Sequence, residues 1–111
     1  MKKFLLVMGL AMSVNCFGGS VTAKVSFIQV NNKTGYPNIV AIKPSIVPSS
    51  RPSCATDTHG RFAASLETEA GRAIYSMVLA AQASEKTLEI YGTNTCIGGA
   101  LEEIDYIRIK E

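Results

Sequence analysis

Three cysteines, at positions 16, 54 and 96, limit most strongly what this chain can fold into. Cys16 falls within an N-terminal export signal, so two cysteines remain once that signal is removed. Two cysteines in an oxidising compartment are the number needed for one disulfide. A chain this short gains only marginal stability from its hydrophobic core, so a covalent link contributes much. The sequence therefore predicts a small exported domain held by a Cys54–Cys96 disulfide.

The N-terminus has the pattern of a signal peptide. Two lysines precede an apolar run from Phe4 to Val14. A transmembrane helix needs ~20 apolar residues, so this run is too short for stable membrane insertion and matches a signal-peptide core instead. The small residues of Val21-Thr22-Ala23 predict cleavage after Ala23, and a site nearer Gly18 to Ser20 is the alternative. The expected location of the protein is therefore secreted or periplasmic.

Cys16 raises a second interpretation of the leader. A bacterial lipoprotein signal ends in a cysteine that is lipidated and becomes the new N-terminus. That motif requires a large aliphatic residue three positions before the cysteine and a small residue directly before it. Ser13 and Asn15 occupy these positions and fit poorly. We therefore expect Cys16 to be discarded with the signal, which occupies residues 1–23.

Residues 24–111 are expected to form one domain without net charge. The two lysines of the leader account for the excess of basic over acidic residues in the chain. The remaining lysines and arginines form no cluster, whereas nucleic-acid binding leaves a basic footprint on the protein. The composition therefore argues against a nucleic-acid partner.

Metal binding is the alternative use for the two remaining cysteines. His59, five residues after Cys54, is the other soft ligand in the chain. Two cysteines and one histidine without a C-x-x-C pair make a poor zinc site. A disulfide that closes a loop of this size is worth about 4 kcal/mol on the chain-entropy account. The sequence thus favours the disulfide and predicts no metal or cofactor.

The order of apolar periodicities predicts five strands and one helix. Thr68 is the expected N-cap of the helix, with Glu69 in its first turn. The layout β-β-β-α-β-β favours a mainly antiparallel sheet and matches a small OB-fold-like β-barrel. The expected strands are 24–31, 38–43, 61–66, 86–92 and 103–110, the helix is 69–84, and residues 45–60 form an irregular loop.

The predicted helix has an unusually broad apolar surface. Its expected apolar face consists of Ala70, Ile74, Met77, Val78 and Ala81, widened by Tyr75 and Leu79. One small sheet does not normally cover so wide a face. The helix is therefore expected either to be deeply packed or to contribute to an oligomer.

The stretch from Leu66 to Cys96 carries a resemblance. Its mostly apolar helix, short turn at Ser84-Glu85-Lys86 and alternating strand resemble the B subunits of AB5 toxins, chiefly the subtilase-cytotoxin and pertussis-like group. The same stretch is also similar to small exported bacterial proteins without an assigned role. The toxin resemblance implies an OB-fold that assembles as a homo-oligomeric ring of five and binds glycans on its outer face. It implies no particular sugar-contact residue, and the chain contains no tryptophan.

Catalytic and calcium-binding arrangements are weak in this sequence. Asp57-Thr58-His59 has residues of a catalytic pair, but a triad depends on geometry and no G-x-S-x-G motif is present. His59 is therefore interpreted as a solvated loop residue, and no enzyme activity is expected. Glu102, Glu103 and Asp105 lack the spacing of a calcium loop and are interpreted as a solvated strand edge.

Tyrosines are the remaining candidates for ligand contact. Tyr36, beside Pro37 in the expected hairpin loop, is the candidate for stacking on a sugar ring. Packing explains Tyr75, Tyr91 and Tyr106 equally well. The sequence thus predicts an exported, non-enzymatic binding module, with glycan binding of the toxin-B-subunit kind. The alternative is a periplasmic or secreted accessory protein that binds another protein.

Overall fold

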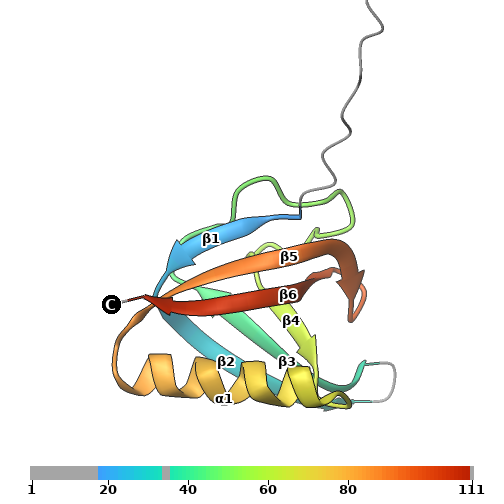
Figure 1. The fold of residues 1–111 in the computed structure, drawn as a ribbon. Helices are drawn as coiled ribbons and strands as arrows, with labels where there is room; N and C mark the ends of the chain where they lie inside the picture. The colour runs from blue at the N-terminus through green and yellow to red at the C-terminus, as the bar shows by residue number, and fades with distance from the viewer. Residues whose placement is uncertain (1–17, 34–35, 111) are drawn as a thin grey trace, which may run out of the picture.

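The computed structural model describes residues 18–33 and 36–110. They form one curled sheet with one helix packed along its concave side, a half-barrel of the OB-fold-like kind that the sequence predicts (Figure 1). The elements are β1 (Ser20–Ala23), β2 (Val25–Lys33), β3 (Tyr36–Pro44), β4 (Phe62–Ser65), α1 (Glu69–Ala83), β5 (Thr87–Ile97) and β6 (Leu101–Lys110).

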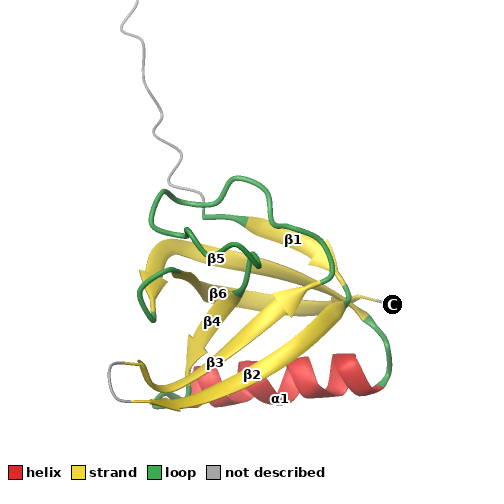
Figure 2. Cartoon of the chain, turned by 180° about the vertical axis from the view of Figure 1, so that it is seen from behind, coloured by secondary structure: helices red, strands yellow, loops and turns green. Residues whose placement is uncertain are grey.

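The strand order across the sheet is β1-β5-β6-β4-β3-β2. Neighbouring strands are antiparallel except β4 and β6, which run parallel with Phe62 opposite Glu102. The parallel pair follows from α1, because the helix carries the chain across the barrel between β4 and β5. Figure 2 shows the curled sheet and the helix from the opposite side. The prediction of a mainly antiparallel sheet is confirmed.

Several strands are longer than the sequence predicted. β2 and β3 leave only residues 34–35 between them, where a loop of about six residues was expected. β5 continues to Ile97 through the expected turn at Gly92 to Cys96. Its pairing with β6 shifts register on either side of Gly92. Such an irregularity bends a strand without ending it, which is why turn residues here do not stop β5.

The first strand, β1, was not predicted, because its residues fell within the expected signal. Ser20 to Ala23 pair with Tyr91 to Leu88 of β5. Val21 and Ala23 point into the core and are buried, whereas Thr22 between them is exposed. This alternation is that of a half-buried strand. Most of the expected leader, residues 1–17 with Cys16, lies outside the described residues.

The core lies between the helix and the concave side of the sheet. Val78 and Ala81 of α1 are fully buried there. The inner cluster consists of Val21, Ala23, Val40, Ile42, Phe62, Ala64, Val78, Ala81, Leu88, Ile90, Ile104 and Ile107. A smaller cluster on the other side of the sheet consists of Ile39, Ala41, Ala63 and Leu101. This second cluster shows that the sheet also buries apolar side chains on its outer side.

The helix begins as predicted, since the Thr68 side chain accepts a hydrogen bond from the Gly71 backbone N–H. The expected apolar face is too wide, however, because the curled sheet contacts only one side of α1. Ala70 is exposed, and Met77 and Leu79 keep 36% and 43% of their surface exposed. Gly71 determines which side of α1 faces the sheet, because the helix approaches β4 so closely there that a Cβ would overlap the Ser65 carbonyl oxygen.

The predicted disulfide is confirmed. Cys54 and Cys96 are bonded, with their Cα atoms 6.1 Å apart and a sequence separation of 42. The bond joins the loop of residues 45–60 to β5. Because this loop carries no regular element of its own, the disulfide fixes its middle against the sheet.

Candidate functional site

Two hollows lie beside the loop of residues 45–60. The first, here named the Tyr91 hollow, has a volume of about 320 Å³. It is built by β1, β5 and the first part of the loop. Its lining residues are Ser20, Val21, Thr22, Ile46, Val47, Ser49 and Tyr91.

Backbone hydrogen bonds hold the walls of the Tyr91 hollow together. Ser20 and Ser49 exchange two of them, at 3.2 and 3.1 Å, so the loop is attached to β1. Ser20 in turn lies opposite Tyr91 in the β1–β5 pairing. Ser20 of β1, Ser49 of the loop and Tyr91 of β5 therefore lie side by side, and backbone pairing sets the distances between them.

The Tyr91 ring is held on the outer face of the sheet. It stacks on Tyr106, with ring centroids 4.5 Å apart and an interplanar angle of 16°. Its hydroxyl donates a hydrogen bond to the Glu89 carboxylate at 3.0 Å. This bond raises the pKa of the Tyr91 phenol above its usual value. Ring and hydroxyl are thus both fixed, which lowers the entropic cost of any contact the ring makes.

The lining of the Tyr91 hollow combines apolar surface with hydroxyl groups and contains no charged residue. Ile46 and Val47 are 56% and 64% exposed, which is high for large apolar side chains. Binding sites for small organic ligands typically have such a mainly apolar wall with a few polar groups. The arrangement suits a ligand with one apolar face and several hydroxyls.

The second hollow, here named the Arg61 hollow, has a volume of about 420 Å³. It lies on the outer side of β2 and β3, next to the turn before β6. Its lining residues are Gln29, Asn31, Ile39, Asp57, Arg61, Gly98, Ala100 and Leu101. It is therefore larger than the Tyr91 hollow and much richer in polar side chains.

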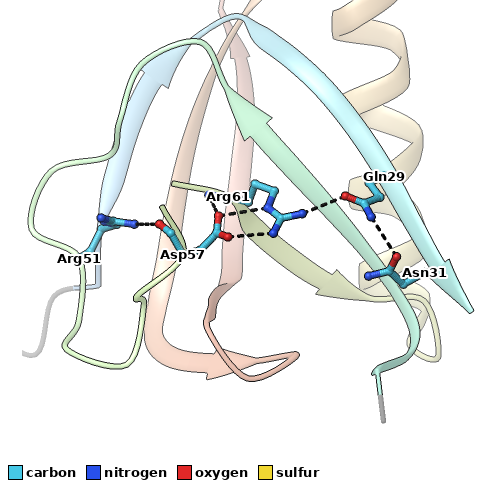
Figure 3. Close-up of polar contacts among 5 residues, drawn as sticks. All are labelled: Gln29, Asn31, Arg51, Asp57 and Arg61. Atoms are coloured by element: carbon cyan, nitrogen blue, oxygen red, sulfur yellow. Dashed lines mark hydrogen bonds and ion pairs between the residues drawn. The ribbon is translucent and has the colours of Figure 1, made fainter. Parts of the chain in front are cut away.

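The polar side chains of the Arg61 hollow are bonded to one another (Figure 3). Arg61 donates to both carboxylate oxygens of Asp57, at 2.8 and 3.1 Å, and to the Gln29 amide oxygen at 2.9 Å. Gln29 donates to Asn31 at 3.2 Å, and Arg51 donates to the Asp57 carbonyl oxygen at 2.7 Å. The chain of contacts joins the loop to β2.

The Asp57–Arg61 ion pair has little contact with solvent. The Arg61 and Asp57 side chains are 20% and 9% exposed. The hydrogen bonds from Arg61 lower the pKa of Asp57, and the same contact raises the pKa of Arg61. The two charges therefore neutralise each other, and Arg61 uses its donors inside the protein.

Asp57 and His59 do not form the catalytic pair considered from the sequence. The Asp57 carboxylate binds Arg61, while the exposed His59 ring lies edge-on to Phe27 with centroids 6.3 Å apart. Within the described residues, no hydrogen bond links the two side chains. His59 here packs on the sheet.

Of the predicted contact residues, Tyr36 begins β3 instead of lying in a loop, and its backbone lies opposite Lys33. Its side chain lies outside the described part of the structure, so its role stays a prediction. Tyr91 was interpreted from the sequence as packing, and its place in a hollow was missed. The alternation of β5 did show that Tyr91 and buried Ile90 face opposite sides, but no local pattern shows what loop lies beside it.

Glu102 corrects the prediction of a solvated strand edge. Its side chain is 1% exposed, whereas Glu103 is half-buried and Asp105 is exposed. Because Glu102 lies opposite Phe62 across the parallel pair, it points to the inner side of the barrel. The strand predicted at 103–110 did not include Glu102, because β6 begins two residues earlier than expected, at Leu101.

No helix among the described residues is both long and apolar enough to cross a membrane. The same residues contain no group of three or more His, Cys, Asp or Glu side chains that could hold a metal ion. Comparison of the chain with protein families, curated proteins and solved structures finds no match. The two hollows are therefore the candidate binding sites of the described residues.

Proposed function

We propose that the protein is an exported, non-enzymatic binding module that binds a glycan in the Tyr91 hollow, in the manner expected of a toxin B subunit. The observation that carries this proposal is the fixed Tyr91 ring beside hydroxyls and exposed apolar side chains. The disulfide supports the exported part, because such bonds persist mainly in oxidising compartments such as the periplasm or the extracellular space.

A pyranose ring has the chemistry that this lining would recognise. One face of the sugar presents C–H groups that pack on an aromatic or aliphatic surface, here Tyr91 with Ile46 and Val47. Its hydroxyls both donate and accept hydrogen bonds, as do those of Ser20 and Thr22. The absence of charge in the lining favours recognition through packing and hydroxyl contacts over ionic attraction.

The proposal is tested by a glycan array probed with the exported protein, followed by calorimetric titration of the best glycan. Thr22→Val removes one hydroxyl from the hollow with little change in shape. Thr58→Val is the matched control, since Thr58 is an exposed threonine outside the hollow. We expect Thr22→Val to weaken binding about five- to tenfold, from the loss of one hydrogen bond of about 1 kcal/mol. Equal affinities for both variants would contradict the site.

A second candidate function, binding to another protein, rests on exposed apolar side chains. Ile46 and Val47 on the loop, and Met77 and Leu79 on α1, are all more than a third exposed. The partner would be a separate protein or further copies of this chain in a ring. Light scattering on a sizing column separates these cases: a mass near five times that of one chain favours the ring, and a monomer favours the accessory role.

A further inference from the structure

The Glu102 carboxylate lies in a closely fitted site at the end of the barrel. It is 1% exposed and accepts the Gly19 backbone N–H at both oxygens, at 3.0 and 2.9 Å. The Asn94 backbone N–H donates to one of the same oxygens at 3.0 Å. A Cβ on Gly18 or Gly92 would overlap this carboxylate, and one on Gly19 would lie 2.7 Å from it. Gly18 and Gly19, just before β1, and Gly92 in β5 thus leave the space that Glu102 fills.

The site is short of positive charge. Among the described residues, the ion pair that forms joins Asp57 to Arg61, and no lysine or arginine forms an ion pair with Glu102. Burial raises the pKa of Glu102, although the N–H groups of Asn94 and Gly19 and the charge of Arg51 act in the opposite direction. A buried carboxylate without a cation is unfavourable, because the charge has lost its hydration. A positive group at the Gly19 nitrogen would offset that cost.

Processing of the leader would create such a group in place. Cys16 and Gly18 put small residues at the third and first positions before the Gly18–Gly19 bond, the pattern that signal peptidase requires. Hydrolysis of this bond adds one water, leaves the new carboxylate on Gly18 and frees the Gly19 nitrogen as an amine. Protonated, that nitrogen is an ammonium 2.9–3.0 Å from both Glu102 oxygens, if Gly19 stays where it is.

We propose that signal cleavage occurs between Gly18 and Gly19, and that the new α-ammonium of Gly19 forms a buried ion pair with Glu102. This site belongs to the range near Gly18 to Ser20 that the sequence left open. Cleavage after Ala23 would instead remove β1, which pairs with β5 along its whole length and carries buried Val21 and Ala23. It would leave the edge of β5 unpaired and Glu102 without Gly19.

The first test is the N-terminal sequence and intact mass of the protein recovered after export of the full chain. The expected first residue is Gly19, and a chain that begins at Lys24 or elsewhere would overturn the proposal. Gly18→Leu places a large residue directly before the bond, and we expect the unprocessed precursor to accumulate. Unchanged processing of this variant would also overturn the cleavage site.

The ion pair has its own test, which compares chains that begin at Gly19 and at Gly18. The extra glycine keeps the N–H of Gly19 but moves the ammonium one residue away. We expect the melting temperature of the Gly19 form to be higher by roughly 4–8 °C. The difference should disappear with Glu102→Gln and persist with Glu103→Gln, the matched control on the next residue. Equal melting temperatures of the two forms would overturn the ion pair.

If Glu102→Gln does not fold, the pKa of the α-amine in the Gly19 form tests whether the ion pair exists. An ordinary α-amino group titrates at about 7.7–8.0. Pairing with buried Glu102 should raise the pKa above that range, as measured by NMR, and a value within the range would overturn the ion pair. None of these measurements involves a glycan, so their outcome is independent of the proposed function.

Discussion

The Tyr91 and Arg61 hollows lie beside the same loop, yet their polar groups differ in what they are bonded to. In the Arg61 hollow the guanidinium, the carboxylate and the Gln29 amide are bonded to one another. In the Tyr91 hollow, the Ser49 hydroxyl donates to the Ser20 carbonyl oxygen at 3.4 Å and the Tyr91 hydroxyl donates to Glu89, but within the described residues the hydroxyls of Ser20 and Thr22 make no hydrogen bond. The larger and more polar hollow is therefore the less suitable binding site, because its hydrogen-bonding groups already have partners.

The two hollows also differ in what their residues contribute: those of the Arg61 hollow stabilise the fold, and those of the Tyr91 hollow are available to a ligand. The Asp57–Arg61 pair and the disulfide both attach the loop to the sheet, and neither depends on a ligand. Ile46 and Val47, at the other end of the loop, stay exposed although they are apolar. We therefore expect changes at the Arg61 hollow to alter unfolding, and changes at the Tyr91 hollow to alter binding.

The largest effect is expected from the disulfide. Replacing both Cys54 and Cys96 by serine should lower the free energy of unfolding by about 4 kcal/mol, because the unfolded chain regains the entropy of a long loop. Urea denaturation of the oxidised protein and the double variant measures the difference. Coincident unfolding curves would show that the bond does not hold the loop in the way described.

The next largest effect is expected from Arg61, whose replacement should change stability without changing glycan affinity. Arg61→Met removes the cation from the largely buried Asp57 carboxylate, which keeps only the backbone N–H of residue 61, and should cost roughly 3 kcal/mol of stability. Glycan affinity should be unchanged, because Arg61 does not line the Tyr91 hollow. Arg72→Met is the control, since Arg72 is exposed on α1 and its side chain donates to the Leu66 carbonyl oxygen. Loss of glycan binding in Arg61→Met would contradict the separation of the two hollows.

The reverse result is expected from the other side. Tyr91→Ala removes the aromatic wall and should weaken glycan binding at least tenfold, or about 1.4 kcal/mol. The stability loss should be smaller than that of Arg61→Met, because the Tyr91–Tyr106 stack lies on the outer face and is worth only ~0.5–1.5 kcal/mol. Calorimetry and thermal unfolding of the same samples give both values. An unchanged affinity would remove the Tyr91 hollow as the binding site.

The smallest effect concerns acid stability. The pKa of Asp57 is lowered in the folded protein, so its contribution is complete above the unfolded value of ~3.9 and is lost as pH falls through the folded value. Asp57→Asn should therefore reduce the difference in stability between pH 5 and pH 2. Denaturation at both pH values checks this, and an identical pH dependence in the variant would contradict the assignment.

Features that depend on a local sequence pattern, such as the helix, could be predicted from the sequence. Sites formed by residues far apart in the chain could not. Thr68 and the periodicity of α1 predicted the helix, and two cysteines predicted the disulfide. β1 was missed because the same residues also fit a signal peptide. Glu102 was predicted to be solvated because the expected strand began at Glu103, whereas β6 begins at Leu101. The Tyr91 hollow was missed because Ser20, Ser49 and Tyr91 meet only after folding.

Mapping of backbone chemical shifts during a glycan titration shows in which of the two hollows the glycan binds. The isotope-labelled exported protein would be titrated with the glycan that binds best on the array. We expect the largest shifts at Ser20, Thr22, Val47 and Tyr91, with Gln29 and Arg61 unaffected. Shifts centred on Gln29 and Arg61, with Tyr91 unchanged, would contradict this expectation and place binding in the other hollow.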